Sequence, residues 1–137
     1  MSSFEVVGGK KLSGTIYPQG AKNEALQIIC AVLLSKEKII IKNVPDIIDV
    51  NKLIKLLKSL GVKVEKISKG IFAFESDDID LNYLNTQDFE LKGRSLRGSI
   101  MIIGPLLARF GVASIPRPGG DKIGRRRLDT HFENLIK

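Results

Sequence analysis

The sequence predicts a mixed α/β (α+β) fold in which short strands alternate with amphipathic helices, and three observations indicate this class. Apolar residues recur with helical spacing in several segments. Short runs rich in β-branched residues stand between those segments and end at Gly or Pro. The second half of the chain also repeats the order of the first. With 137 residues, the chain is long enough for one ordinary domain with its own core.

The chain is expected to begin with two short strands, Phe4 to Val7 and Leu12 to Tyr17, around the Gly8-Gly9 turn. Pro18-Gln19-Gly20 then breaks the chain, and a helix follows. Its buried stripe is predicted to consist of Ala25, Ile28, Ile29, Val32 and Leu33. Cys30, the only cysteine, lies on the same apolar side, so packing is its expected role, and an internal disulfide is excluded.

Lys22 and Asn23 fall at the start of this predicted helix. Free backbone N–H groups and the helix dipole favour an anion at such a position. Two interpretations remain open at this point. Asn23 is a plain helix cap and Lys22 a solvated lysine, or the two together bind an anion.

The next elements are a strand, a helix and a hairpin. Ile39-Ile40-Ile41 is a β-branched run that ends at a Pro-containing turn. Asp49 can cap a helix that ends at Gly61. The apolar stripe of that helix is Leu53, Leu56, Leu57 and Leu60. Strands at Val62 to Ile67 and Ile71 to Phe74 form the hairpin, and the acidic stretch Glu75 to Glu90 is expected to be an irregular surface connection.

Residues 97–137 resemble the first unit in the order of their elements. In a helix expected from Arg97 to Ala108, Ile102, Leu106 and Leu107 match Ile29, Leu33 and Leu34 at a constant spacing. A strand at Val112 to Ile115 matches the Ile39 run, and a last helix is expected from Leu128 to Lys137. The second copy is longer only within Pro116 to Arg127. A loop added to a repeated scaffold is a frequent place for function.

The added loop is rich in glycine and cations. Pro118-Gly119-Gly120 lets the backbone approach a ligand closely. Asp121 follows at the tip, and the cations are Lys122, Arg125, Arg126 and Arg127. Arginines in such a loop suit phosphate or carboxylate groups, although a solvated basic loop has the same composition. Asp121 is then either a charge balancer or a proton-transfer group.

Charge and hydropathy restrict the class of protein further. The net charge of +7 favours an anionic partner, whether nucleic acid, a membrane surface or a phosphorylated metabolite. No apolar run reaches the roughly 18 residues that a membrane span needs. No basic-then-apolar signal segment opens the chain, so a cytoplasmic protein is expected.

Five segments together resemble the UDP-N-acetylglucosamine enolpyruvyl transferase family. They are GAKNEAL at Gly20 to Leu26, NVPDIIDV at Asn43 to Val50, LGVKV at Leu60 to Val64, GPLLARFG at Gly104 to Gly111 and PGGDKIGRRRLDTH at Pro118 to His131. The resemblance implies an inside-out α/β barrel built from βαβαββ repeats, with one full unit and part of a second in this chain. Residues 1–21 are then strands of the family's second domain, and residues 22–137 are a partial first domain truncated within a helix.

The resemblance also implies a reaction, namely enolpyruvyl transfer from phosphoenolpyruvate to the 3′-hydroxyl of UDP-N-acetylglucosamine in bacterial peptidoglycan synthesis. Lys22 and Asn23 match residues that engage both substrates, with Lys22 also catalytic, and Arg97 matches an arginine of the same anionic pocket. Arg126 matches an arginine that contacts phosphate. The segment along the uridine diphosphate comprises Arg126, Arg127, Leu128, Asp129 and Thr130. No cofactor and no metal are expected.

Asp121 stands where the family commonly has a cysteine that acts as general acid. A minority of the family carries aspartate there, so the resemblance implies that Asp121 is the general acid. Fosfomycin alkylates that cysteine, and resistance to it is therefore expected here.

Two alternatives remain. The related shikimate 3-phosphate enolpyruvyl transferases share the repeat, but their helix start typically reads SKS where this chain has AKN. A basic nucleic-acid-binding domain also fits the charge, but aromatic residues make up only 6% of the chain and no stacking platform is apparent. Neither nucleic acid nor membrane is therefore the expected partner. The chain alone is expected to be inactive and to self-associate through uncovered apolar faces of its last two helices.

Overall fold

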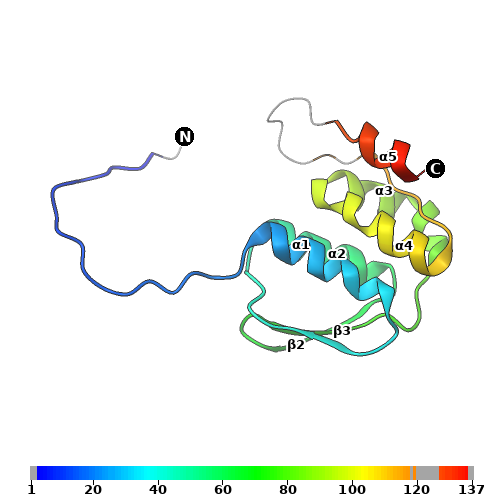
Figure 1. The fold of residues 1–137 in the computed structure, drawn as a ribbon, viewed down its shortest axis with the longest axis horizontal. Coiled ribbons are helices and arrows are strands. Elements are labelled where there is room, and N and C mark those ends of the chain that lie inside the picture. The colour runs from blue at the N-terminus through cyan, green and yellow to red at the C-terminus, as the bar shows by residue number, and fades with distance from the viewer. Residues whose placement is uncertain (1–2, 118, 120–126, 136–137) are drawn as a thin grey trace.

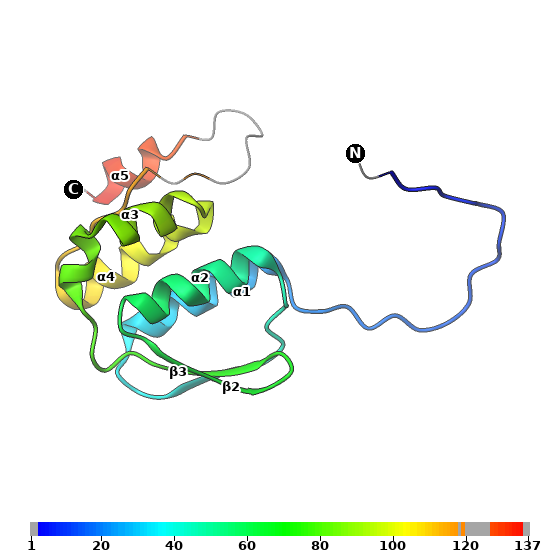
Figure 2. The same cartoon turned by 180° about the vertical axis from the view of Figure 1, so that it is seen from behind.

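The computed structural model describes residues 3–117, 119 and 127–135. Figures 1 and 2 show a small sheet with α1 and α2 lying over one of its faces, and α3 and α4 beyond these two helices. Residues 3–20 run away from this body without helix or strand. The mixed α/β class predicted from the sequence is therefore confirmed for the part that the structure describes.

The sheet has three antiparallel strands in the order β1-β3-β2. They are β1 (Ile39–Ile41), β2 (Lys63–Ser68) and β3 (Ile71–Glu75). The predicted hairpin is thus confirmed, and Gly70 at its turn has a φ of 71°, which favours glycine. Because Phe74 of β3 is fully buried, the inner face of the sheet is part of the core.

The outer face of the sheet carries charges. Ala73, at the centre of β3, is buried, and two ion pairs lie on the same face of the sheet, Lys38–Glu65 at 3.1 Å and Lys63–Glu75 at 2.8 Å. A polar outer face with an apolar inner face is typical of an antiparallel sheet that covers the core on one side only. Apart from Ala73, the buried apolar residues therefore lie on the side of the sheet that faces the helices, and not on its outer face.

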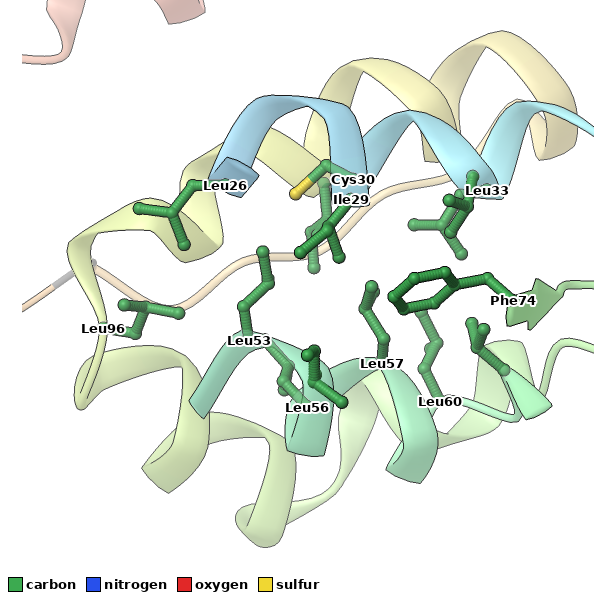
Figure 3. Close-up of a cluster of buried hydrophobic side chains, with 14 of the residues drawn as sticks. Leu26, Ile29, Cys30, Leu33, Leu53, Leu56, Leu57, Leu60, Phe74 and Leu96 are labelled. Atoms are coloured by element: carbon green, nitrogen blue, oxygen red, sulfur yellow. The ribbon is translucent and has the colours of Figure 1, made fainter. Parts of the chain in front are cut away.

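The core lies between the sheet and two long helices, α1 (Lys22–Ala31) and α2 (Ile48–Ser59) (Figure 3). A short 3₁₀ helix, η1 (Val32–Leu34), continues α1. The predicted stripes are confirmed by burial, since Ala25, Ile29, Val32, Leu33, Leu53, Leu56, Leu57 and Leu60 are all buried. The exception is Ile28, which is 44% exposed.

The two copies of the repeat pack against each other. The second copy has a 3₁₀ helix, η3 (Arg97–Ile102), followed by α4 (Ile103–Phe110). Here α1 contacts η3, and η1 contacts α4, so the two segments lie side by side with like ends together. The Arg109 guanidinium donates hydrogen bonds to the carbonyls of Leu33 and Ser35, which joins their carboxyl ends.

Three of the predictions about where helices and strands form are wrong. The strands expected at Phe4 to Val7 and Leu12 to Tyr17 are not formed, because residues 3–20 have no partner strand within the described chain. The strand expected at Val112 to Ile115 is also absent, and its residues lie as irregular chain. The stretch expected to be an irregular connection contains two helices, η2 (Leu81–Asn85) and α3 (Gln87–Arg94).

These two helices form because the acidic stretch also carries apolar anchors and caps. Leu84 and Phe89 are buried in the core. The Thr86 hydroxyl accepts a hydrogen bond from the Phe89 N–H, and the Asp80 carboxylate accepts one from the Asn82 N–H. A ring contact between Tyr83 and Phe89, with centroids 5.7 Å apart, joins the pair.

The apolar helices of the second copy are covered more fully than the sequence suggested. Ile102, Ile103 and Leu106 are buried within the chain itself. In α5 (Asp129–Leu135), by contrast, Phe132 is 39% exposed and Leu135 is 48% exposed. Met101 of η3 is 37% exposed, so the expected uncovered apolar residues are found in part in both places.

Candidate functional site

A cavity of about 660 Å³ lies where three helical segments begin. Lys22 and Asn23 reach it from the first turn of α1, and Arg97 from the first residue of η3. The structure thus brings together three residues that the sequence nominated from segments far apart in the chain. Asp49 and Lys52 of α2 also line it, and neither was nominated for the site.

The helix starts at this cavity lack side-chain caps in the described structure. Ala21 precedes α1, Ile47 precedes α2 and Leu96 precedes η3, and none of these side chains accepts a hydrogen bond from the first turn. Elsewhere, η2 and α3 are capped by Asp80 and Thr86. Uncapped N–H groups and the positive ends of helix dipoles favour an anion, so the cavity suits a phosphate or a carboxylate.

Close backbone contacts position these helix starts. A Cβ at Gly20, just before α1, would clash with the backbone carbonyl of Asn43. A Cβ at Gly98 would lie 3.1 Å from a methyl group of Leu26, so glycine lets η3 approach α1. The small residues beside Lys22 and Arg97 therefore bring the two cations to one cavity.

The Lys22 ammonium donates a hydrogen bond to Oδ2 of Asp49 at 3.0 Å. This contact corrects the prediction that Asp49 caps α2. The capping position belongs to Ile47, and Asp49 lies within the first turn, where a carboxylate is also favoured by the helix dipole. Of the two interpretations left open for Asn23, the plain helix cap is wrong as well, since Ala21 holds the capping position and Asn23 lies inside α1.

Lys52 is the third cation of the cavity. Its ammonium donates a hydrogen bond to the backbone carbonyl of Ser95 at 3.2 Å, and Ser95 lies two residues before Arg97. Sequence reasoning missed Lys52 because it belongs to a helix with two more lysines, Lys55 and Lys58. The available signal was its spacing, because residues at i and i+3, here Asp49 and Lys52, share one side of a helix.

The glycine-rich loop is described only at its two ends. Asp121, Lys122, Arg125 and Arg126 lie outside the described residues. Before them, a Cβ at Gly93 of α3 would press on the Pro116 ring, and a Cβ at Gly119 would clash with the Arg94 backbone. The loop therefore starts against the end of α3, which leads directly to Ser95 and Arg97.

After the loop, Arg127 forms an ion pair with Asp129, with Nε and Oδ2 3.0 Å apart. Leu128, Asp129 and Thr130 stand at the start of α5. None of these residues is among those that line the cavity in the described structure. Their expected contact with a nucleotide stays a prediction.

Cys30 has no nucleophilic role in this arrangement. Its side chain is almost fully buried in the core (Figure 3), and this burial raises the pKa of its thiol to about 12. A thiolate is therefore scarce at neutral pH. Among the described residues, no group of three His, Cys, Asp or Glu side chains is placed to hold a metal ion.

Comparison with known proteins places these residues in a family context. The family model for EPSP synthase (3-phosphoshikimate 1-carboxyvinyltransferase) matches residues 6–137. A UDP-N-acetylglucosamine 1-carboxyvinyltransferase of Bacteroides fragilis is 58% identical over 132 residues, which are 96% of this chain and 30% of that protein. The protein of the same name from Porphyromonas gingivalis is 53% identical and covers 98% of this chain and 31% of its own length.

A solved structure agrees at the level of the fold. The crystal structure of the enolpyruvyl transferase NikO from Streptomyces tendae matches with a TM-score of 0.58 and 21% identity, covering 77% of this chain and 24% of that one. The chain spans about 30% of the length of the curated relatives that it matches. No helix in the described part of the chain has the length and apolar character needed to cross a membrane.

Proposed function

We propose, from the premise that the chain belongs to the EPSP synthase (3-phosphoshikimate 1-carboxyvinyltransferase) family, that it is part of an enzyme of that family acting on UDP-N-acetylglucosamine. The reaction is enolpyruvyl transfer from phosphoenolpyruvate to the 3′-hydroxyl of the sugar nucleotide, which belongs to peptidoglycan synthesis. The single observation that carries this proposal is 58% identity over 96% of the chain to a UDP-N-acetylglucosamine 1-carboxyvinyltransferase.

The cavity supports this choice on physical grounds. Both substrates are highly anionic, and they repel each other as they approach. Lys22 and Arg97, together with uncapped helix starts, supply fixed positive charge in one place. Fixed charge of this kind offsets the repulsion and stabilises the phosphate as it departs. In this proposal Lys22 and Asn23 engage both substrates, and Arg97 binds the anionic groups of phosphoenolpyruvate.

The glycine-rich loop supplies the proton in this proposal. The 3′-hydroxyl of the sugar loses its proton to a base and its oxygen forms a bond to C2 of phosphoenolpyruvate, while Asp121 gives a proton to C3. The bond from C2 to the phosphate oxygen then breaks and inorganic phosphate leaves, a base takes a proton from C3, and the C2–C3 double bond is restored. Arg126 contacts the phosphate. Support comes from the start of the loop, which lies against the end of α3 next to the segment that carries Arg97.

We also propose the larger architecture that family membership suggests. The sheet and the helices of residues 22–110 are one unit and part of a second in an inside-out α/β barrel. The charged outer face of the sheet and the helix-lined interior are consistent with that form. Residues 3–20, which lack a partner within the described chain, belong to a second domain. Residues 127–130 lie along the uridine diphosphate.

A coupled assay tests the function. The protein encoded by the complete open reading frame is purified and supplied with phosphoenolpyruvate, and phosphate release is followed with UDP-N-acetylglucosamine or with shikimate 3-phosphate. Release that depends on the sugar nucleotide supports the proposal. Release that depends on shikimate 3-phosphate alone would contradict the proposal and assign the chain to the activity in the name of the matched family model.

A further inference from the structure

Lys52 of α2 is an exposed lysine that lines the cavity. It lies one turn beyond Asp49 on the same side of α2, and both line the cavity. Two other lysines of this helix, Lys55 and Lys58, are also exposed but do not line it. Lys52 is therefore the one lysine of α2 that the helix turns towards the cavity in the described structure.

The charge of Lys52 is left uncompensated by its partner. Its ammonium donates to the Ser95 carbonyl at 3.2 Å, and this oxygen is neutral. Lys22, by comparison, is paired with the Asp49 carboxylate at 3.0 Å. Within the described part of the chain, no carboxylate lies within ion-pair distance of the Lys52 ammonium. An ammonium has three donors, so two remain after the bond to Ser95.

We propose that Lys52 is a further substrate-binding residue, which donates to the phosphate group of an anionic substrate in this cavity. The inference rests on the proposed function, which makes the cavity the anion site of the enzyme. Its bond to Ser95 holds the ammonium beside the segment that carries Arg97, so the two cations reach one anion from α2 and from η3. The phosphate belongs either to phosphoenolpyruvate or to the diphosphate of the sugar nucleotide.

A set of substitutions separates this binding role from a purely structural one. Lys52→Gln removes the charge but keeps an N–H donor that can bond to the Ser95 carbonyl. Lys52→Arg keeps both the charge and a donor. Lys55→Gln makes the same change of charge on the same helix outside the cavity. Thermal unfolding of each variant checks that the fold is retained.

The chain, labelled with ¹⁵N, is titrated with inorganic phosphate, phosphoenolpyruvate and UDP-N-acetylglucosamine, and Kd is read from amide shifts. Loss of one charge-assisted hydrogen bond is expected to raise Kd about tenfold in Lys52→Gln. Lys52→Arg should stay within about threefold of the unmodified chain, and Lys55→Gln should match it. The ligand whose Kd rises most in Lys52→Gln identifies which phosphate Lys52 meets.

Two negative results have different meanings. Equal Kd values for Lys52→Gln and Lys55→Gln, with binding by the unmodified chain intact, would overturn the role of Lys52 alone. Absence of any shift with all three ligands at tens of millimolar would count against the proposed function and against Lys52 together. If Lys52→Gln unfolds, Lys52→Arg takes its place in the comparison. A tenfold rise in Kd for Lys52→Arg, which keeps the charge, would also overturn the inference.

Discussion

The Lys22 ammonium and the Asp49 carboxylate, from the first turns of two different helices, lie 3.0 Å apart beside the cavity. Their side chains are 43% and 36% exposed, so the pair contributes at most about 1 kcal/mol to stability. The ion pair matters more for position, because it holds the Lys22 ammonium beside the cavity, where a substrate anion would bind. Asp49 also places a negative charge beside the same anion.

Asp49→Asn is therefore expected to strengthen anion binding. The amide oxygen can still accept a hydrogen bond from Lys22, while the repulsive charge is gone. Affinity for inorganic phosphate should rise about three- to tenfold, and the free energy of unfolding should change by less than about 1 kcal/mol. Titration of the chain measures the first and urea unfolding the second. Asp78→Asn, on an exposed loop, is the matched control, and weaker phosphate binding by Asp49→Asn would contradict the expectation.

Arg97→Lys tests whether the shape of the guanidinium matters in addition to its charge. A planar fork binds a carboxylate or phosphate through two parallel hydrogen bonds, and an ammonium does not. We expect Kd for phosphoenolpyruvate to rise about tenfold in Arg97→Lys. Arg94→Lys, a surface substitution three residues earlier, provides the comparison. Equal affinity in the two variants would show that only the charge of Arg97 is needed.

Phe74→Ala tests the core at the inner face of the sheet. Phe74 is fully buried between the sheet and the two long helices (Figure 3), so its loss leaves a cavity and should lower the free energy of unfolding by about 3–5 kcal/mol. Ile40→Ala, on the outer face of the same sheet and 54% exposed, should cost no more than about 1 kcal/mol. Urea denaturation compares them, and similar losses would contradict the described orientation of the sheet.

Because its thiol is buried, Cys30 should make the free energy of unfolding decrease at alkaline pH. Its thiol has a pKa raised to about 12 in the fold by burial, against about 8.5 when unfolded. Above about pH 8.5 the unfolded state binds fewer protons than the folded state, so stability, fully present below that pH, is lost as pH rises. The free energy of unfolding should fall by up to about 1.4 kcal/mol per pH unit between roughly pH 8.5 and 10.

The matching variant is Cys30→Ala, in which this slope should disappear. Iodoacetamide provides an independent measurement, since the folded thiol should react only as fast as the chain unfolds. Rapid labelling of the folded chain at pH 8 would show that Cys30 is accessible and would remove the basis of the prediction.

Asp121 leads to a prediction about inhibition of the protein that the complete open reading frame encodes. A carboxylate is a much poorer nucleophile towards fosfomycin than a thiolate, so the unmodified protein should resist time-dependent inactivation. Asp121→Cys should become sensitive and remain active. Because the unperturbed pKa of aspartate is about 3.9 and that of cysteine about 8.5, activity should also peak at lower pH with aspartate. Fosfomycin covalently attached to this loop in the unmodified protein would refute the prediction.

Local pattern was enough to predict the elements that bury an apolar stripe. The helices around Ile29 and Leu57 and the hairpin at Gly70 follow from spacing and turn residues alone. The strands at the N-terminus were not formed, because a strand needs a partner and spacing does not identify one. The α3 helix was missed because acidic composition concealed its anchor, Phe89, and its cap, Thr86.

The candidate site was predictable only in part. Lys22 and Asn23 stood out because they begin a helix, and Arg97 because its segment resembles a known family. Asp49 and Lys52 were not foreseen, since their importance depends on two helices starting at one cavity. That proximity is a property of packing between segments distant in sequence, and no local rule contains it.

The most direct measurement is a map of where phosphoenolpyruvate binds on the ¹⁵N-labelled chain. Amide shifts are expected at the first turns of α1, α2 and η3, because Lys22, Asp49 and Arg97 line the cavity and these helix starts lack side-chain caps. The basic hairpin, with Lys66 and Lys69, should stay unchanged. Shifts confined to that hairpin, or none at tens of millimolar ligand, would contradict the proposal that this cavity is the substrate-anion site.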